Sequence, residues 1–560
     1  MHRSGGCRDR RPVDRPRWPS AVTTATPDTA TAPQPALYNA AADLIERNLR
    51  ARAEKVAFVD DGGSYSYGDL AQRVDRCAGA LLDLGIHPEQ RVVLGLLDTI
   101  DFPAAFLGAI KAGIVPIPVN TLFQPIDYAF ILADSRAKAA IVSAELLPAY
   151  EEAARLASWT GRIVVSDPRG TYRDGKHPTL QQLTANATPL ADAAPTRPDD
   201  VCFWLYSSGS TGKPKGTVHV QTSMIRTAEL FAQGVLGMRE DDVVFSAAKL
   251  FFAYGLGNAL SFPMSVGATA VLHAGRATPD VVSTILRERG ATIFCGVPTL
   301  FGALLVHPEL PARGEVALRL CTSAGEPLPE EIGKNWTARF GVEIVDGIGS
   351  TEMLHIFVSN RPGAVKYGTT GLPVPGYGVR IVGEDGREVA PGELGELEVC
   401  GETAAAHYWN NREKSRRTFC GEWTRTGDKY RQDEAGYFVY CGRVDDMLKV
   451  GGIWVSPSEV EAALVAHVDV LEAAVIGVAD EQELIKPKAF VVVKPGVTPS
   501  AELGDALKAH VKSRLAPYKY PRWIEFVPEL PKTATGKIRR HVLRQAQDDV
   551  SSRRARADIA

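Results

Sequence analysis

One stretch of the sequence, Tyr206–Gly216, combines hydroxyls, glycines and lysines at a spacing suited to holding a polyphosphate. It reads Tyr-Ser-Ser-Gly-Ser-Thr-Gly-Lys-Pro-Lys-Gly and follows the apolar run Val201–Leu205, which is typical of a strand. Glycines let the backbone approach a ligand closely, and successive amide N–H groups can form an anion-binding concavity. The stretch is not a P-loop, because Pro214 follows Gly212-Lys213 and Ser207 takes the place of the first glycine. A flexible surface turn is the alternative interpretation of this composition.

Two further loops follow strand-like runs and carry small or polar residues. Gly349-Ser350-Thr351-Glu352 places a carboxylate beside hydroxyls, a combination that can hold magnesium directly or through water. A helix cap at Ser350 or Thr351 is the alternative. Ser323-Ala324-Gly325-Glu326 follows the run Leu318–Cys321 and offers a small-residue surface on which a flat purine could rest. An ordinary strand–helix turn is the alternative there.

Two motifs in the last third of the chain could contact a nucleotide. Thr426-Gly427-Asp428 precedes a predicted hairpin that turns at Asp433–Gly436, and its carboxylate could accept from both hydroxyls of a ribose. A turn-forming aspartate is the alternative. Near the C-terminus, Pro531–Lys537 ends in a lysine on a Gly/Thr loop, which could reach a phosphate or an ionised carboxylate, although most such lysines are simply solvated.

The length and composition set broad limits. A chain of 560 residues should contain two or more domains, and a formal charge of −3 gives no reason to expect nucleic acid as a partner. No apolar run approaches the roughly 18 residues needed to span a bilayer, so no membrane partner is expected. The eight cysteines contain no Cys-x-x-Cys pair, and Cys202, Cys295 and Cys400 lie in apolar, strand-like runs. We therefore expect reduced cysteines in the core of a cytoplasmic protein.

Strand and helix patterns alternate along the chain and predict α/β layers with largely parallel sheets. The predicted helices are Ala41–Arg52, Asp69–Leu84, Phe102–Ala112, Ser458–Val465 and Ala501–Arg514, and a hairpin is predicted around Asp61-Gly62-Gly63. The predicted strands are Arg91–Leu97, Val115–Val119, Ala139–Val142, Ile163–Val165, Val243–Ser246, Ala473–Val478 and Ala489–Val493. After Arg443 the pattern predicts a separate α+β unit of domain size.

Each motif is modest alone, but their order along the chain resembles the acyl-adenylate-forming superfamily. The matching stretches are Tyr206–Gly216, Gly349–Glu352, Thr426–Asp428, Gly442–Gly452 and Pro531–Lys537. The resemblance covers essentially all of Leu37–Arg544. Within the superfamily, the stretches Lys249–Asn258 and Gly347–Phe357 are most similar to the benzoate–CoA ligases.

The resemblance implies an α/β fold with a large N-terminal domain of layered sheets, a small β subdomain, and a small, mobile α+β C-terminal domain. We expect the N-terminal AMP-binding domain at residues 35–444 and the mobile domain at 445–545. Residues 1–34 and 546–560 are expected to be a disordered extension and a disordered tail.

The implied reaction has two steps. A carboxylate attacks the α-phosphate of ATP to give acyl-AMP and pyrophosphate, and the thiol of coenzyme A then displaces AMP. Lys537, Glu352 and Thr211 are the implied catalytic residues, with Glu352 and Thr211 also holding magnesium. The implied nucleotide-binding residues are Ser207, Ser208, Gly209, Ser210, Thr211, Gly212, Lys215, Ala324, Gly325, Glu326, Asp346, Gly347, Ile348, Ser350, Thr351, Asp428, Arg443 and Lys537.

The resemblance also implies sites for the two other substrates. Ala253, Tyr254, Gly349, His355 and Ile356 match positions that line the aryl pocket, although a plain core histidine is the alternative for His355. Asp445 is the implied hinge. The implied coenzyme A contacts are Lys449, Gly451, Gly452, Trp454, Lys519 and Arg522; surface charge is the alternative for the lysines and arginine.

The expected activity is therefore an ATP-dependent aryl–CoA ligase that acts on benzoate or a substituted benzoate. The alternatives are another acid, such as a hydroxybenzoate or a medium-chain acid, or transfer to a carrier protein. A catalytically inactive adenylate-binding scaffold is disfavoured by the intact Lys537, Glu352, Asp428 and Arg443. We expect a monomer or homodimer.

Overall fold

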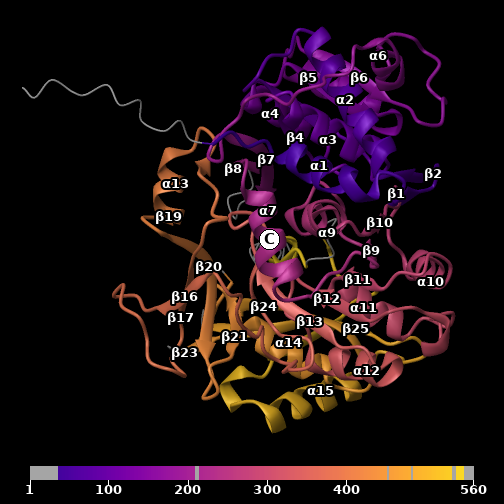
Figure 1. Cartoon of the computed structure of the whole chain (residues 1–560). Helices are drawn as coiled ribbons and strands as arrows, with labels where there is room; N and C mark the ends of the chain where they lie inside the picture. Colours follow the sequence, from indigo (N-terminus) through magenta and orange to yellow (C-terminus); the bar gives the residue numbers. More distant parts are fainter. Residues whose placement is uncertain are drawn as a thin grey trace, which may run out of the picture. The chain divides into compact units, whose positions relative to one another are not determined.

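The strand–helix alternation of the first 170 residues forms a four-stranded parallel sheet in the order β4-β3-β5-β6, and Figure 1 labels three of its strands, β4, β5 and β6, beside helices α2, α3 and α4. In this computed structural model the described residues are 36–208, 214–444, 446–450, 453–480, 484–532 and 538–547. All the elements below belong to the unit Leu37–Ala560. The strands are β3 (Arg91–Gly95), β4 (Val115–Pro118), β5 (Ala139–Ser143) and β6 (Arg162–Ser166). The near-continuous apolar character of these strands suits burial on both faces.

Helices connect and cover these strands. They are α1 (Ala40–Arg52), α2 (Tyr67–Asp83), α3 (Asp101–Lys111), α4 (Pro125–Ser135), η1 (Ala144–Leu146), α5 (Leu147–Leu156) and α6 (Leu180–Asn186). Helix α2 begins at a capping box in which the Ser66 side chain accepts from the Asp69 backbone and the Asp69 carboxylate accepts in return. On α3, Phe102 and Phe106 are fully buried, and Phe106 packs edge-on against Phe203.

The described strands form a second, nine-stranded sheet in the order β15-β14-β13-β12-β11-β9-β10-β1-β2. Its strands are β1 (Val56–Asp60), β2 (Gly63–Ser66), β9 (Val243–Ser246), β10 (Thr269–Val271), β11 (Ile293–Gly296), β12 (Leu320–Ser323), β13 (Ile344–Gly349), β14 (Ile356–Ser359) and β15 (Leu372–Pro373). The strands from β1 to β13 are parallel, and the edge strands β2, β14 and β15 pair antiparallel. Ligands of open α/β sheets bind beyond the carboxyl ends of such parallel strands.

The helices around this sheet include two π-helical segments. The elements are α7 (Ser223–Thr227), η2 (Ala228–Gln233), α8 (Ala253–Leu256), η3 (Gly257–Ser261), α9 (Phe262–Val266), α10 (Pro279–Glu288), α11 (Pro298–Leu305), η4 (Arg313–Glu315) and α12 (Glu330–Phe340). The segments η2 and η3 are π-helical. Such segments are frequent at functional sites, and η3 directly follows the helix that carries Tyr254.

Two smaller sheets complete the part of the chain before residue 445. The first has the order β18-β8-β7, from β7 (Val201–Ser208), β8 (Pro214–Val220) and β18 (His407–Tyr408). The second contains β16 (Gly378–Val382), β17 (Gly395–Cys400), β19 (Phe419–Cys420), β20 (Trp423–Gln432) and β21 (Phe438–Arg443), with α13 (Arg412–Thr418) before it. Strand β18 pairs with β8, which brings residues 407–408 beside residues 217–218.

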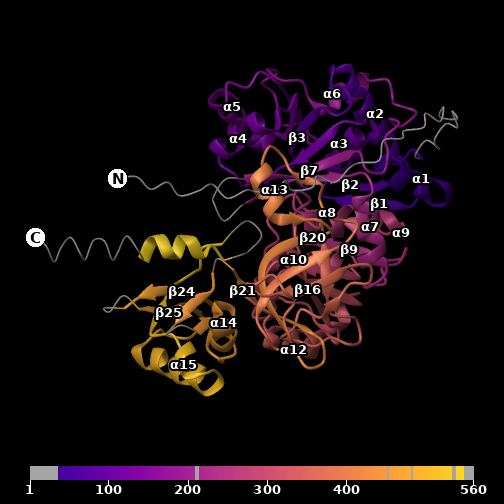
Figure 2. The ribbon, with the colours of Figure 1, turned by 90° about the vertical axis from the view of Figure 1, so that its left-hand side faces the viewer.

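The last hundred residues form a mixed sheet with its own buried core. Figure 2 shows β24, β25, α14 and α15 as one group of elements. The elements are β22 (Leu448–Val450), β23 (Ile453–Val455), α14 (Pro457–Val465), β24 (Val470–Ala479), β25 (Ile485–Val493), α15 (Ala501–Arg514), η5 (Pro517–Lys519), β26 (Trp523–Phe526) and helical residues 540–547. Arg540 is tied to Glu461 of α14 at 2.7 Å, and Gln547 accepts from Lys488 at 2.6 Å. The helical turn thus continues past residue 545, where the disordered tail was expected to begin.

The predicted helices and strands listed above are confirmed to within a few residues, and so is the β1–β2 hairpin. Two expectations were wrong. Thr426–Asp428 does not precede the hairpin as a loop but lies within strand β20, where Gly427 has a φ of +73°. No helix follows Ser350 or Thr351, because the chain turns and enters β14, so the helix-cap alternative fails. Cys202 and Cys295 are buried free thiols as predicted, whereas Cys400 is only half-buried.

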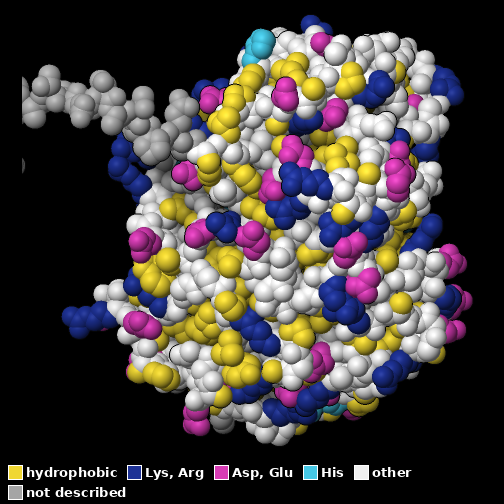
Figure 3. All heavy atoms as spheres, in the orientation of Figure 1, with side chains coloured by type: hydrophobic (Ala, Val, Ile, Leu, Met, Phe, Trp, Pro, Cys, Tyr) yellow, Lys and Arg dark blue, Asp and Glu magenta, His cyan; other side chains and the backbone are white. Residues whose placement is uncertain are grey.

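The described residues contain no helix that is both long and apolar enough to cross a bilayer. On the face shown in Figure 3, acidic and basic side chains are interspersed. This pattern agrees with the small formal charge of the whole chain.

Candidate active site

A cluster of Lys215, Glu352 and Tyr408 joins three segments that are far apart in the sequence. Lys215 on β8 donates to Oε1 of Glu352 at 2.8 Å and to the Tyr408 hydroxyl at 2.8 Å, and that hydroxyl donates to the same Glu352 oxygen at 2.7 Å. The Lys215 ammonium also lies 4.2 Å from the centre of the Tyr408 ring. The β8–β18 pairing and the turn after β13 create this meeting point.

Glu352 is held in its ionised form. Burial alone would raise the pKa of its carboxyl group, but the Lys215 ammonium and the two hydrogen bonds outweigh burial and lower the pKa to about 2. The preceding residue is also fixed, because His219 Nε2 lies 2.8 Å from the Thr351 carbonyl oxygen. Burial lowers the pKa of His219 to about 4, so its imidazole is neutral and donates from Nε2. The Glu352 carboxylate is therefore ionised and held by hydrogen bonds beside the paired strands β7 and β8.

The carboxyl ends of β12 and β13 form a second group of predicted residues. Ser323 and Asp346 are register partners at these ends, and both are buried. Burial raises the pKa of Asp346 well above its ordinary value, which favours the protonated acid. Ala324 and Gly325 follow β12 without bulky side chains, and Gly325 has a φ of +96°, which glycine adopts readily. A small-residue surface thus lies beside a buried acid, as a slot for a flat base requires.

Glu326, in the same turn, is linked to the end of the chain. Its Oε1 accepts a hydrogen bond from the Ile538 backbone at 3.1 Å. Ile538 is the residue after Lys537 in the sequence.

Asp428 and Arg443 are brought together by the pairing of β20 with β21. They are register partners, and Arg443 Nη1 lies 3.0 Å from Asp428 Oδ1. The same guanidinium donates to the Thr426 carbonyl at 3.2 Å. A Cβ on Gly427 would lie 3.0 Å from Arg443 Nη2, so glycine leaves room for this arrangement. The pair offers both an acceptor and donors, which is suitable for the two hydroxyls of a ribose.

The residues expected in the aryl pocket fall into two groups. Ala253, Tyr254 and Gly349 are partly buried, whereas His355 and Ile356 are fully buried. The His355 ring lies 4.4 Å from Phe262, 5.4 Å from Phe231 and 5.5 Å from Tyr254, measured between ring centres. Burial lowers its pKa to about 3, so the ring is neutral. His355 is thus packed among three aromatic rings, one of them Tyr254, and both interpretations of this residue, a pocket residue or a core histidine, are compatible with this packing.

Several buried polar side chains gather around Tyr254. The Tyr254 hydroxyl faces the side chains of Thr322 and Asn258, whereas Nδ1 of His355 has no hydrogen-bond partner among the described residues. A buried polar group without a partner costs free energy comparable to a lost hydrogen bond. The His355 Nδ1 atom is such a group, and Asn258 is a residue that the sequence reasoning did not select.

The expected coenzyme A contacts are less well assembled. Lys519 is paired with Glu459 of α14 at 2.6 Å, whereas Arg522 is exposed and lies 4.9 Å from the Tyr520 ring centre. Lys449 is exposed on β22. The remaining predicted residues Gly209, Ser210, Thr211, Gly212, Asp445, Gly451, Gly452 and Lys537, and the side chains of Ser208 and Trp454, lie outside the described residues.

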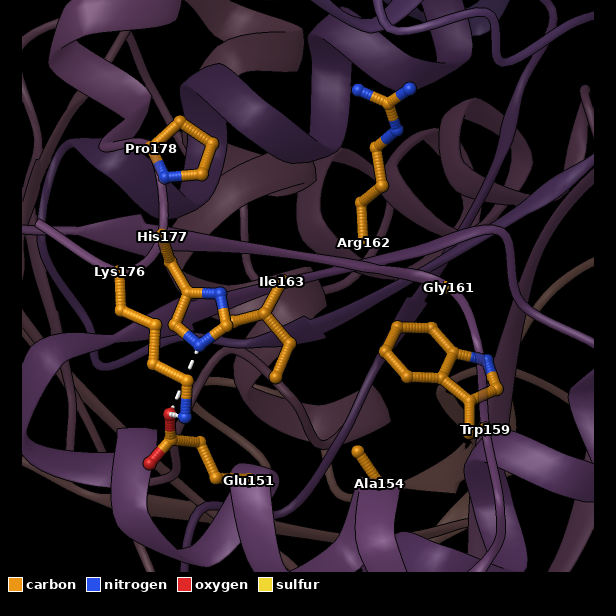
Figure 4. A pocket seen from close by; sticks show the side chains of 9 residues that line it. All are labelled: Glu151, Ala154, Trp159, Gly161, Arg162, Ile163, Lys176, His177 and Pro178. Atoms are coloured by element: carbon orange, nitrogen blue, oxygen red, sulfur yellow. Dashed lines mark hydrogen bonds and ion pairs between the residues drawn. The ribbon is translucent and has the colours of Figure 1, made fainter.

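A surface pocket of about 500 Å³ lies elsewhere, between α5, β6 and the loop after β6 (Figure 4). Glu151 binds Lys176 at 2.6 Å and His177 at 3.0 Å on one side of it. Figure 4 shows Trp159 and Arg162 standing apart from this charged group. No residue predicted for the nucleotide, the acid or coenzyme A lines the pocket.

Tyr408 is the main residue of the candidate site that sequence reasoning missed. The aromatic run His407-Tyr408-Trp409 was a possible signal, but its partner strand lies about 190 residues earlier. The sequence contains no pattern that pairs these two segments.

Comparisons with known proteins show the family to which the chain belongs. Residues 45–409 match the family described as AMP-binding enzyme, and residues 459–537 match the family described as AMP-binding enzyme C-terminal domain. The chain is 59% identical over 515 residues to a benzoate–CoA ligase from Thauera aromatica, covering 91% of this chain and 97% of the relative. It is 51% identical over 518 residues to a 4-hydroxybenzoate–CoA/benzoate–CoA ligase from Rhodopseudomonas palustris, covering 91% and 94%.

A solved structure of a benzoate CoA ligase from Burkholderia xenovorans LB400 superimposes with a TM-score of 0.86 at 55% identity, over 91% of this chain and 100% of that one. The match extends over both family regions rather than over one domain. The chain therefore belongs to the AMP-binding enzyme family, and within it the chain is similar to benzoate–CoA ligases.

Proposed function

We propose that the chain is an ATP-dependent aryl–CoA ligase that converts benzoate into benzoyl-AMP and then into benzoyl-CoA. In the first step a carboxylate oxygen bonds to the α-phosphorus and pyrophosphate leaves. In the second step the sulfur of coenzyme A bonds to the acyl carbon, AMP leaves, and the thiol proton passes to solvent. The names of the two relatives from Thauera and Rhodopseudomonas support this substrate class.

The observation that carries the proposal is the Lys215–Glu352–Tyr408 cluster beside the β7–β8 hairpin. Charge must be neutralised as two anions, the acid and the triphosphate, approach each other. A fixed ammonium and a permanently ionised carboxylate at this hairpin supply groups for the phosphates and for a cation. On this proposal the hydroxyls and amides of residues 207–212 hold the β- and γ-phosphates.

The donor set around Glu352 suits magnesium. Its carboxylate is ionised at any physiological pH, and the described residues contain no group of three His, Cys, Asp or Glu side chains that could form an all-protein cage. Magnesium is typically held by one or two carboxylates together with substrate phosphates and water. Glu352 would thus hold the ion, with the hydroxyl of Thr211. When bound, magnesium would offset the negative charge on the phosphates.

The nucleotide would lie across the two strand-end groups. Asp428 and Arg443 would bind the ribose hydroxyls, and residues 324–326 with Asp346, Gly347 and Ile348 would enclose the adenine. Lys537 would bridge the carboxylate and the α-phosphate. The hydrogen bond from the Ile538 backbone to Glu326 supports this role, because it places the following residue at the adenine loop. Asp445 would serve as the hinge that withdraws Lys537, after which Gly451 and Gly452 would line the path of the thiol.

A substituted benzoate is a second candidate substrate. The buried Tyr254 hydroxyl and Asn258 amide lie beside each other and offer polar atoms to a hydrogen-bonding group on the ring. The relative from Rhodopseudomonas palustris is named as a ligase of both 4-hydroxybenzoate and benzoate.

A pyrophosphate-release screen tests the proposal. The purified chain is given MgATP with benzoate, 4-hydroxybenzoate or hexanoate, and coenzyme A is compared with a phosphopantetheinyl carrier protein. We expect release with the benzoates and coenzyme A. Release with hexanoate alone, or with the carrier protein alone, would contradict the proposal.

A further inference from the structure

Asp98 is a buried carboxylate outside every site described above. It lies in the loop between β3 and α3, and only 4% of its surface is exposed. Both of its oxygens accept from the Leu250 backbone N–H, at 3.2 and 3.4 Å, and Oδ2 lies 3.9 Å from Lys249 Nζ. Asp98 thereby connects the first, four-stranded sheet to the segment that leads into α8.

This segment is a tight turn pressed against the helix that carries Ala253 and Tyr254. The Phe252 backbone donates to the Lys249 carbonyl at 3.0 Å, and Leu250 is fully buried. A Cβ on Gly255 would lie only 2.0 Å from the Lys249 carbonyl oxygen and 2.5 Å from that of Ala248. Helix α8 therefore rests directly on the two carbonyls at the start of the turn. A shift of residues 249–250 would move Tyr254.

The other charged groups near this turn have partners of their own. Lys249 also donates to the His273 carbonyl, and the His273 ring lies 3.9 Å from Asp61. The neighbouring Asp60 is occupied by the backbone N–H groups of Ile100, Gly62 and Gly63.

Burial raises the pKa of Asp98 to about 6, even though Lys249 and the Leu250 N–H oppose this change. A carboxylate kept in such a place costs stability, and groups retained at a cost to stability commonly serve function.

We propose that Asp98 is a positioning residue for the aryl acid: by holding Leu250 and Lys249, it sets the position of the Tyr254 wall. This inference rests on the proposed function, because it assumes that Ala253 and Tyr254 contact the acid. Asp98 itself touches no substrate. Its loss should raise the KM for the acid and leave the KM for ATP unchanged.

The chain offers a matched control in Asp101. It lies three residues further on, is 3% exposed, and accepts from Ser166 and Gln181, each at 2.7 Å, rather than from the 249–254 segment. Asp101→Asn therefore removes a buried carboxylate from the same region without changing a contact to residues 249–254.

The test compares Asp98→Asn, Asp98→Ala, Lys249→Met and Asp101→Asn by steady-state kinetics and thermal unfolding. Asp98→Asn keeps an oxygen for Leu250 but loses the charge facing Lys249, so we expect a KM for benzoate about threefold higher. Asp98→Ala also loses the hydrogen bond and should raise it about tenfold. For both variants the KM for ATP should stay within about twofold of the wild type, and Asp101→Asn should leave the KM for benzoate unchanged.

The outcomes separate the two levels of inference. If the wild-type chain releases no pyrophosphate with any benzoate, the proposed function fails. If it does, but the Asp98 variants match Asp101→Asn or raise the two KM values equally, only the role of Asp98 fails. Should Asp98→Ala not fold, the near-isosteric Asp98→Asn together with Lys249→Met decides the question by the same split between KM values.

Discussion

Removing the ammonium of Lys215 should expose how strongly it holds Glu352. In the Lys215→Met variant, the Glu352 carboxylate keeps only the Tyr408 hydroxyl as a side-chain partner. The pKa of Glu352 is lowered from 4.5 to about 2 in the folded protein, and its side chain is only 15% exposed. A change of about 2.5 pKa units corresponds to about 3 kcal/mol. We therefore expect the variant to lose about 2–3 kcal/mol of unfolding free energy at pH 7.

The stability difference between the wild type and Lys215→Met should depend on pH. A carboxyl whose folded pKa is depressed contributes stability above its unfolded pKa of about 4.5, and that contribution is lost as the pH falls toward the folded value. In the variant, burial without the ammonium raises the pKa of Glu352 instead, so protonation relieves the cost. The difference between wild type and variant should therefore shrink as the pH falls from 7 to 4.

Urea unfolding at several pH values measures this difference, and Glu352→Gln with the double variant completes the cycle. We expect the single effects to be non-additive by more than about 1 kcal/mol, because the two groups touch. A pH-independent difference below about 0.5 kcal/mol, or additive effects, would refute the reasoning.

Three further predictions follow from single contacts. Tyr408→Phe removes a hydrogen bond to Glu352 and one from Lys215, so it should lower the free energy of unfolding in urea by about 1 kcal/mol. It should also raise the magnesium concentration needed for half-maximal activity. An unchanged magnesium requirement would argue against a metal at Glu352. Gly257→Ala places a Cβ 2.4 Å from Cδ2 of His355, which three aromatic rings enclose, so it should lower the free energy of unfolding by about 1–3 kcal/mol. In the control Gly314→Ala the Cβ meets nothing within 4 Å, and no such loss is expected. Equal melting temperatures of the two variants would count against the enclosure. Burial raises the pKa of Asp98 from 3.8 to about 6, so the wild type should lose about 2 kcal/mol of unfolding free energy as the pH rises from 4 to 7, and Asp98→Asn should escape that loss. Parallel curves of stability against pH, measured by urea unfolding, would contradict it.

Local patterns in the sequence were sufficient for most of the secondary structure. Apolar runs such as Arg91–Gly95 and helical periodicity such as Ala501–Arg514 gave the correct elements because burial follows the period of each. Thr426–Asp428 was misassigned because a Thr-Gly-Asp sequence is typical of a turn. The pairing of β20 with β21 shows that these residues lie inside a strand, where Gly427 has a positive φ.

Contacts between segments that are distant in the sequence could not be predicted from local patterns. Tyr408 reaches Glu352 because β18 pairs with β8, and Asp98 reaches Leu250 across 152 positions. The packing of His355 against Phe262 and Phe231 likewise joins residues that lie about 90 or more positions apart in the sequence. No periodicity or turn signal reports such long-range neighbours.

A rapid-quench experiment with α-labelled ATP tests the central claim most directly. The enzyme, in excess over ATP, is mixed with benzoate and magnesium without coenzyme A, and the quenched mixture is separated. The account predicts that the label accumulates as benzoyl-AMP and that adding coenzyme A converts it to free AMP with one benzoyl-CoA formed for each AMP. Label appearing in ADP, or thioester forming without any labelled acyl-adenylate, would contradict the account.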